Sequence, residues 1–412
     1  MRLRFFFLVV LLCGAFVALL SVHAYGLLTH GKDPRFVRFM RRYDRTPGVQ
    51  ARLPEHAKTI DRRGEPLEVA ETGSAMMHVL DDLALAADGQ PVQLTLDARL
   101  QARAEALMKN RRGAVVALEP MTGKIRVLVS APRVAYLNRA LNGLYPPGST
   151  FKVFMSAAAL SAGVDPLFDC PAAGWRPSPA TQPIRDVEFR DFARRGKVWK
   201  GFGKIRMSDA LMHSSNTYFA QLGAALGPSC FAKAVEAARL RDPVVVLASS
   251  VASLDSVGGG VPEGLTAAQL APVAIGQGAL QLTPLGVAMF TAAVADDGLM
   301  LTPSLSPQTK PTLRARPFTF EAAAQVKRMM RRVVQQGTGR ACEIAGLAVC
   351  AKTGTAENSQ GRDHAWFTCF APQTAPKLVV TVLVENGGFG ATAALPVARG
   401  ILLEARDLGY FK

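Results

Sequence analysis

The sequence predicts an α+β domain in which a mainly antiparallel sheet is flanked by helices and interrupted by a large helical insert. Strand-like runs fall in two groups, at residues 113–131 and 347–385, and a largely helical stretch separates them. An amphipathic helix closes the chain at about residues 392–406. One apolar run, residues 5–28, precedes the domain and is long enough for a single transmembrane helix.

This apolar run decides the compartment of the rest of the chain. At about 1.5 Å per residue, a helix over residues 5–28 crosses a hydrocarbon core about 30 Å thick. We expect residues 1–4 to be a cytoplasmic tail and residues 5–28 an uncleaved signal-anchor in the inner (plasma) membrane. The alternative is a cleaved signal peptide that ends near Val22-His23-Ala24. Both readings place the remaining residues outside the cytoplasm, in a periplasmic or other extracytoplasmic space.

The composition fits a folded protein with an anionic neighbour. Hydrophobic residues make up 49% of the 412 residues and charged residues 19%, which argues against a disordered chain. The net charge of +16 favours nucleic acid, an anionic membrane face or an acidic polymer as a partner. Export and the lack of a nucleic-acid-binding motif argue against nucleic acid.

The cysteines and histidines give no sign of a metal site. The sequence has no Cys-x-x-Cys and no pair of histidines at ligand spacing, so we expect neither a metal nor another cofactor. In an oxidising compartment Cys342 and Cys350 are the pair most suited to form a disulfide, because they lie close in sequence. Buried free thiols remain the default expectation.

The elements before the insert can be assigned from their patterns. Residues 29–92 form a juxtamembrane region, and a helix is expected through Leu100 and Met108. Residues 113–119 and 125–131 are rich in β-forming residues and flank a five-residue turn that contains glycine, which predicts a hairpin.

The insert and the closing elements follow. A buried helix begins at Ser149 and runs to Ala162, after Tyr145-Pro146-Pro147-Gly148 ends the preceding element. Residues 166–336 are mostly helical, with irregular stretches at about 171–203 and 257–264. The strands and helix that close the domain are expected at residues 347–354, 365–371, 378–385 and 392–406.

Ser149-Thr150-Phe151-Lys152 supplies a nucleophile and a base. A serine hydroxyl is a poor nucleophile until a base removes its proton, and a lysine three residues later projects from the same face of a helix. An apolar or cationic environment lowers the pKa of such a lysine. The N-terminus of the helix also offers unpaired N–H groups to a developing oxyanion.

Two later strings supply the remaining groups. Ser214-Ser215-Asn216 reads as a loop entering a helix, where Ser214 can relay a proton and Asn216 can bind a substrate amide. Lys352-Thr353-Gly354-Thr355 lies on a strand, where a cation and two hydroxyls suit a carboxylate and Gly354 permits close approach.

Each string alone has an ordinary structural reading. Ser149 and Ser214 are also suitable helix caps, and Lys352 is also a plausible surface lysine on a strand. The three strings in this order match the signature of penicillin-binding proteins and serine β-lactamases. The ordered set therefore favours one catalytic site over three unrelated structural roles.

The sequence around the strings resembles the monofunctional, class B type of penicillin-binding protein. The resemblance runs from about Gln93 to Glu404 and is carried by LTLDARLQARAEALM, GAVVALEPMTGKIRVLVSAP, YPPGSTFK, HSSNTYFAQLG, IGQGALQLTPLGVA, QQGTGRACEIAGLAVCAKTGTAE and HAWFTCFAP. It implies a transpeptidase domain over residues 93–412 with the fold of penicillin-binding proteins and serine β-lactamases. TIDRRGEPL resembles a short strand that such proteins carry near the membrane.

The resemblance also implies roles for the site residues. Ser149 would be the acylated nucleophile, Lys152 its base and Ser214 the proton shuttle to the leaving D-alanine. Asn216 would hold the stem-peptide amide. The residues implied to bind the terminal carboxylate are Lys352, Thr353 and Thr355, with Gly354 between them; backbone N–H groups of Ser149 and Thr355 would form the oxyanion hole.

The implied function is that of a membrane-bound peptidoglycan D,D-transpeptidase. Such an enzyme takes a D-Ala-D-Ala donor and an amine acceptor, is acylated by β-lactams, and has a membrane glycosyltransferase as a candidate partner in cell-wall synthesis for cell shape or division. Two alternatives stay open: hydrolysis by a β-lactamase or D,D-carboxypeptidase, and a non-catalytic β-lactam sensor or cell-wall scaffold.

The chain departs from the family pattern in three places. Ala351 and Cys369 stand where glycine is frequent, but both are small. The segment of residues 68–92 is short at the position where relatives carry an extended pedestal domain, so we expect the pedestal of this protein to be reduced.

One basic stretch, residues 185–206, is left without a function by the motifs. It contains Arg185, Arg190, Arg194, Arg195, Lys197, Lys200, Lys204 and Arg206. These residues either attract anionic stem peptides or a partner, or form a solvated loop.

Overall fold

The computed structural model describes residues 58–67, 80, 83–84, 87, 90–132, 137–250, 252–359 and 361–412. The expected signal-anchor, residues 5–28, lies outside this part of the chain, and so do residues 1–4 and most of the juxtamembrane region. None of the described helices combines the length and the apolar character that a bilayer crossing requires.

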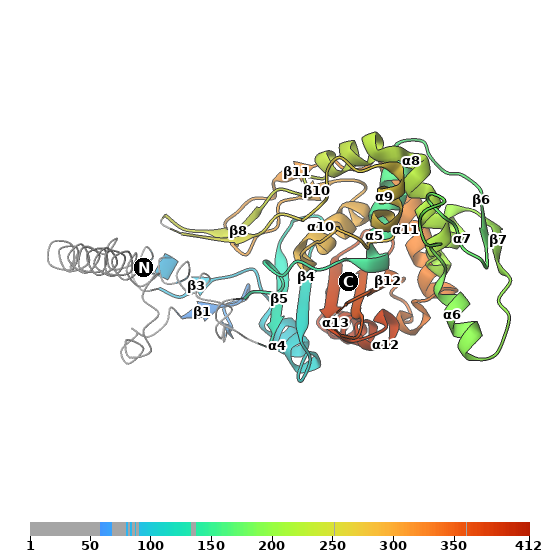
Figure 1. Cartoon of the computed structure of the whole chain (residues 1–412). Helices are drawn as coiled ribbons and strands as arrows, with labels where there is room; N and C mark the ends of the chain where they lie inside the picture. Colours follow the sequence, from blue (N-terminus) through green and yellow to red (C-terminus); the bar gives the residue numbers. More distant parts are fainter. Residues whose placement is uncertain are drawn as a thin grey trace, which may run out of the picture. The chain divides into compact units, whose positions relative to one another are not determined.

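A five-stranded antiparallel sheet forms the centre of the domain, in the order β12-β13-β14-β4-β5 (Figure 1). The predicted hairpin is confirmed, because β4 pairs with β5 in antiparallel register. The three late strands were also predicted, and β12 begins three residues later than expected. The strands are β4 (Gly113–Leu118), β5 (Ile125–Ala131), β12 (Cys350–Ala356), β13 (His364–Ala371) and β14 (Leu378–Val384).

Both faces of this sheet are buried, which explains why its central strands read as continuous apolar runs. Alternate residues of β4 belong to different cores: Val116 packs on one side and Val115 on the other. Helices α4 (Ala98–Leu107) and α13 (Leu395–Asp407) cover one face, with the short α12 (Gly390–Ala393) beside α13. Helix α10 (Pro284–Ala295) covers the other face and is buried all round.

The insert packs against α10 and carries most of the remaining helices. Aromatic rings of Phe151, Phe154 and Phe290 meet at centroid distances of 5.0 to 6.2 Å and join α5 to α10. The helices are α5 (Phe151–Ser161), α6 (Val187–Arg194), α7 (Met207–His213), α8 (Asn216–Ala237), α9 (Ala267–Ala274) and α11 (Phe320–Gln335), with 3₁₀ turns η2 (Gly148–Thr150) and η3 (Arg340–Cys342).

The insert contains more strand than the sequence predicts. Three two-stranded sheets interrupt its helices, and the strands of one of them, β6 and β7, flank the stretch expected to be irregular. Figure 1 shows β6 and β7 at one end of the described domain and the β8 hairpin extending at the opposite end. The strands are β6 (Phe168–Pro171), β7 (Gly201–Ile205), β8 (Val244–Ala248), β9 (Ser253–Ser256), β10 (Met300–Leu301) and β11 (Leu313–Ala315).

A small sheet precedes the domain, as the Thr59–Leu67 string suggested. Strand β1 (Thr59–Ile60) pairs antiparallel with β2 (Pro66–Leu67) and parallel with β3 (Val92–Gln93). Asp61, in the turn between β1 and β2, accepts backbone hydrogen bonds from Arg63 and Glu65 and from Ala98 at the start of α4. This carboxylate therefore fixes the small sheet to the main domain.

Cys342 and Cys350, the pair most suited to a disulfide, are not joined, and the default expectation of buried thiols is confirmed for them. Both thiols are free and buried, and so are those of Cys170 and Cys369. The Cys350 thiol points to the carbonyl oxygen of Lys327 on α11, at 3.4 Å, because the pleat of β12 directs it toward that helix. Proximity in sequence did not predict which way the two side chains face.

Candidate active site

The turn that carries Ser149 is fixed from two sides. Gly148 has φ +53°, and a Cβ there would lie 2.5 Å from the carbonyl oxygen of Thr355 on β12. On the other side, the N–H of Gly148 donates to the carbonyl oxygen of Gly276 at 2.9 Å. Only glycine fits at this position. The predicted helix therefore starts with a 3₁₀ turn through Ser149, and α5 proper begins at Phe151.

Lys152 lies one turn into α5 and is fully buried. Its Nζ donates to the Ser214 carbonyl oxygen at 2.6 Å and to Asn216 Oδ1 at 2.7 Å, and it lies 3.5 Å from Ser214 Oγ. The first two predicted motifs are thus in direct contact across 62 residues of sequence.

Lys352 on β12 reaches the same hydroxyl from the opposite side. Its side chain is also fully buried, and Nζ donates to Ser214 Oγ at 2.7 Å. Ser214 therefore lies between two lysine amines, which is the arrangement a proton relay needs. The surface-lysine reading of Lys352 is excluded by its burial.

The backbone of Ser214 adopts an unusual conformation. It has φ 64° and ψ 33°, the left-handed region that L-residues other than glycine rarely adopt, where it ends α7. Ser215 then caps α8 by accepting from the N–H of Tyr218 at 3.1 Å. Strain of this kind persists only where the surroundings hold it, and it is frequent at functional sites.

Asp186 holds this strained junction in place and was not predicted. Its Oδ1 accepts from Ser215 Oγ at 2.9 Å and from the N–H of Thr217 at 3.0 Å, and its exposed fraction is 2%. Asn216 is tied to the same segment, because its Nδ2 donates to the Arg185 carbonyl oxygen at 3.0 Å. No local pattern marks Asp186, since it lies 28 residues before Ser214 in a stretch without a motif.

Burial sets the protonation of the two lysines. It lowers the pKa of Lys152 from the ordinary 10.5 to about 7, while the carboxylates of Asp186 and Glu188 act in the opposite direction. Burial and the positive charge of Lys152 lower the pKa of Lys352 well below 10.5. Because the two amines are neighbours, they titrate as a coupled pair that releases its first proton easily.

Thr353 and its neighbours form the wall beside β12. The Oγ1 atoms of Thr353 and Thr338 lie 2.7 Å apart, so the loop after α11 supplies a second hydroxyl that sequence reasoning missed. Thr338 lies in the QQGTG string that carries the resemblance, which was the available signal. Gly354 is closely packed, since a Cβ there would lie 2.8 Å from Thr150 Cγ2 and from Trp366 Cβ.

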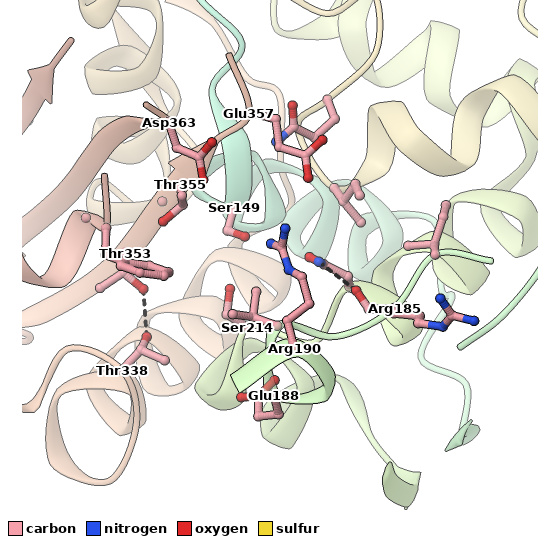
Figure 2. Close-up of a pocket in the computed structure, with 18 of the residues that line it drawn as sticks. Ser149, Arg185, Glu188, Arg190, Ser214, Thr338, Thr353, Thr355, Glu357 and Asp363 are labelled. Atoms are coloured by element: carbon pink, nitrogen blue, oxygen red, sulfur yellow. Dashed lines mark hydrogen bonds between the residues drawn. The ribbon is translucent and has the colours of Figure 1, made fainter. Parts of the chain in front are cut away.

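One open cavity of about 620 Å³ lies at this site, lined by both serines, Asn216 and the β12 wall, whereas the two lysines are buried beneath its surface. Figure 2 shows Ser149 and Ser214 beside it, Thr353 and Thr355 on one wall, and Arg190 rising from α6 on another. Glu357 and Asp363 lie at the edge of the cavity near the β12–β13 turn.

The geometry suits acyl transfer through a serine. A serine at a helix start, a lysine of low pKa, a shared hydroxyl and a second lysine on a strand are the parts of a penicillin-recognising acyl-serine enzyme. A family model described as "Penicillin binding protein transpeptidase domain" matches residues 113–403. The chain belongs to this family.

Relatives with curated names support the same family. The chain is 33% identical over 371 residues to the peptidoglycan D,D-transpeptidase PbpA of Mycolicibacterium smegmatis, covering 77% of this chain and 72% of that protein. It is 30% identical to the PbpA of Mycobacterium tuberculosis, covering 92% and 86%. The ceftriaxone acyl-enzyme structure of penicillin-binding protein A from M. tuberculosis superposes with a TM-score of 0.68 at 28% identity, covering 85% of this chain and 90% of that one.

Proposed function

We propose that this protein is a peptidoglycan D,D-transpeptidase that cross-links stem peptides through an acyl-Ser149 intermediate. The observation that carries the proposal is the convergence of three distant motifs on one hydroxyl: Lys152 and Lys352 both reach Ser214 Oγ, beside the cavity that Ser149 lines.

Acylation would begin with Lys152 in its neutral form. The amine accepts the Ser149 proton while Ser149 Oγ attacks the carbonyl carbon between the two D-alanines of the donor. The backbone N–H groups of Ser149 and Thr355 would hold the oxyanion, which the close approach of Gly148 to Thr355 makes geometrically reasonable. The peptide C–N bond then breaks, and D-alanine leaves with a proton delivered through Ser214.

The opposite wall would hold the donor's terminal carboxylate. Thr353 and Thr355 line the cavity from the edge strand of the sheet, where an extended peptide can lie alongside, and the buried amine of Lys352 on the same strand would add positive charge. The amine of a second stem peptide would then attack the acyl-serine carbonyl and release Ser149. Asn216 already bonds Lys152 and Arg185, so it would position the base as well as bind a substrate amide.

Residues 5–28 would anchor the protein in the plasma membrane, with the transpeptidase domain, residues 93–412, outside the cytoplasm. The length and apolar character of the run support this. A membrane glycosyltransferase that supplies the glycan strands is the partner we propose.

The test is labelling of Ser149. The full chain is incubated with labelled penicillin, and the mass of the Ser149 peptide is followed over hours beside a donor peptide ending in D-Ala-D-Ala and an acceptor amine. We expect a long-lived penicillin adduct and an amide product with the acceptor. Ser149→Ala should abolish both, whereas Ser229→Ala, at an exposed serine on α8, should change neither.

The outcomes separate the alternatives. An adduct that disappears within minutes, or donor hydrolysis that added amine does not divert, would favour the β-lactamase or carboxypeptidase reading. A stable adduct without any turnover of the donor would favour a sensor or scaffold. No adduct at all would contradict the proposal.

A further inference from the structure

The basic stretch at residues 185–206, here called the cationic segment, is continuous with the active site. It holds eight lysines and arginines against three carboxylates, a net charge of +5 over 22 residues. Asp186 is buried and bonded to the start of α8, so it contributes little to the surface. The cations are Arg185, Arg190, Arg194, Arg195, Lys197, Lys200, Lys204 and Arg206, and all eight are exposed.

These cations differ from those elsewhere in the domain. Arg126, Arg139 and Arg331 each meet a glutamate within 2.8 Å. None of the eight cations of the segment forms a salt bridge within the described residues. Apart from Arg185, whose Nε donates to the Ala173 carbonyl oxygen at 3.2 Å, their charge is therefore available to a partner.

The segment is held by the fold instead of extending as a free loop. Strand β7 pairs with β6, and an aromatic row connects the segment to the active site. The rings of Trp199 and Phe202 meet edge to face at 5.1 Å, and Phe202 stacks on His213 at 4.8 Å, one residue before Ser214. The backbone that carries the cations is therefore tied to the loop that holds Ser214.

The first two cations of the segment lie in the cavity itself. Arg185 and Arg190 line it together with Ser149 and Ser214, and Figure 2 shows both on the same side of the site. The guanidinium of Arg185 lies 4.6 Å from the centre of the Phe189 ring, which holds it in place. From here the segment continues to β7, which Figure 1 shows at the end of the described domain.

We propose that the cationic segment is a docking surface for an uncross-linked peptidoglycan strand. This inference rests on the proposed function and adds how the polymeric substrate is held. Every stem peptide with a D-Ala-D-Ala end carries a carboxylate, so a strand is a polyanion whose charges repeat. The terminal carboxylate of the donor stem would lie against the β12 wall, so Arg185 and Arg190 would meet the stem nearest to it on the strand, and the outer cations would meet the carboxylates of stems farther along.

Charge complementarity and continuity with the cavity favour this occupant. Exposed ion pairs are individually weak, so several must act together, and their sum falls as salt rises. Because the segment begins at the cavity with Arg185 and Arg190, a strand that reacts at Ser149 and runs along the segment would bring its neighbouring stems to the outer cations. A short donor peptide does not reach them.

The experiment compares two variants of the full chain with equal charge change. R194Q/R195Q/K197Q/K200Q removes four cations outside the cavity, and R103Q/K109Q/K310Q/R328Q removes four exposed cations elsewhere in the domain. Binding of soluble uncross-linked strands is measured by anisotropy at low and high salt, beside penicillin labelling of Ser149. Strands with amidated carboxylates and vesicles of anionic phospholipid serve as further ligands.

We expect the first variant to bind strands on the order of tenfold more weakly at low salt, with a reduced salt dependence, and the second to stay within about twofold. Labelling of Ser149 should be normal in both, which also shows that they fold. Equal binding by the two variants would overturn the inference, as would equal binding of amidated strands. Loss of vesicle binding without loss of strand binding would assign the segment to a lipid surface and also overturn it. If penicillin does not label the unmodified chain, the proposed transpeptidase function is contradicted. The comparison of the two variants would still decide whether the cationic segment binds strands.

Discussion

The lowered pKa of Lys152 predicts how acylation depends on pH. With a pKa of about 7, about half of this lysine is neutral at pH 7, whereas with the ordinary 10.5 only about 0.03% would be. Burial therefore increases the fraction of active base on the order of a thousandfold. At pH 5.5 the neutral fraction falls to about 3%, so acylation should be about 15-fold slower than at pH 7.

The assay is the second-order rate constant for acylation by a fluorescent penicillin between pH 5 and 9. The carboxylate of the penicillin stays ionised over this range, so the rising limb reports the enzyme. A falling limb at higher pH is expected when the lysine pair loses its second proton, because Lys352 then no longer attracts the carboxylate. A rate that is flat from pH 5.5 to 8, or that rises only above pH 9, would refute the assignment of Lys152 as a buried base.

The same shift has a consequence for stability, which serves as a control. The folded state binds fewer protons than the unfolded state between about pH 7 and 10.5, so the free energy of unfolding rises with pH across this window. At pH 7 the neutral lysine costs about 4 kcal/mol relative to an unperturbed one. Lys152→Met should abolish acylation yet raise the free energy of unfolding at pH 7, by on the order of 2 kcal/mol after lost hydrogen bonds are counted. Lys152→Met that is less stable than the unmodified protein in urea would contradict this account.

Three other substitutions test the supports of the site. Asp186→Asn should slow acylation on the order of tenfold and move the rising part of the pH–rate curve to lower pH, because this carboxylate raises the pKa of Lys152. A slower rate at an unchanged curve position would show that Asp186 has only a structural role. Gly276→Ala should reduce acylation at least about 100-fold, because its Cβ would lie 1.9 Å from the backbone oxygen of Gly148, which precedes Ser149. Gly264→Ala, which has a similar positive φ but open space around it, should leave acylation unchanged, and equal effects of the two substitutions would refute the steric argument. Glu385→Gln should lower the free energy of unfolding in urea by about 3 kcal/mol, because Arg139, whose side chain is 4% exposed, loses its charged partner at 2.8 Å. A decrease below about 1 kcal/mol would show that this ion pair contributes little to stability.

Much of the site was predictable because short sequence motifs supply its reactive groups. Ser149 and Lys152 are one helical turn apart, and Ser214 and Asn216 flank a helix start, so spacing alone places each pair together. The hairpin of β4 and β5 was predictable for the same reason. The prediction for the irregular stretch was less successful, because the pairing of β6 with β7 depends on partners that are distant in the sequence. For Cys342 and Cys350 the default expectation of buried thiols is confirmed, but proximity in sequence could not show which way each side chain faces.

The sequence by itself determined which groups this protein possesses: a serine with a lysine one turn away, a second serine with an amide, and a lysine on a strand. Only the tertiary structure decided that the two lysines share the hydroxyl of Ser214, and that Asp186 holds the junction between α7 and α8 where Ser214 lies. It also decided that both lysines are buried, and therefore that the pKa of Lys152 falls to about 7. The physical reason is that a pKa and a contact depend on all the atoms around a group, and chain segments more than a hundred residues apart supply those atoms.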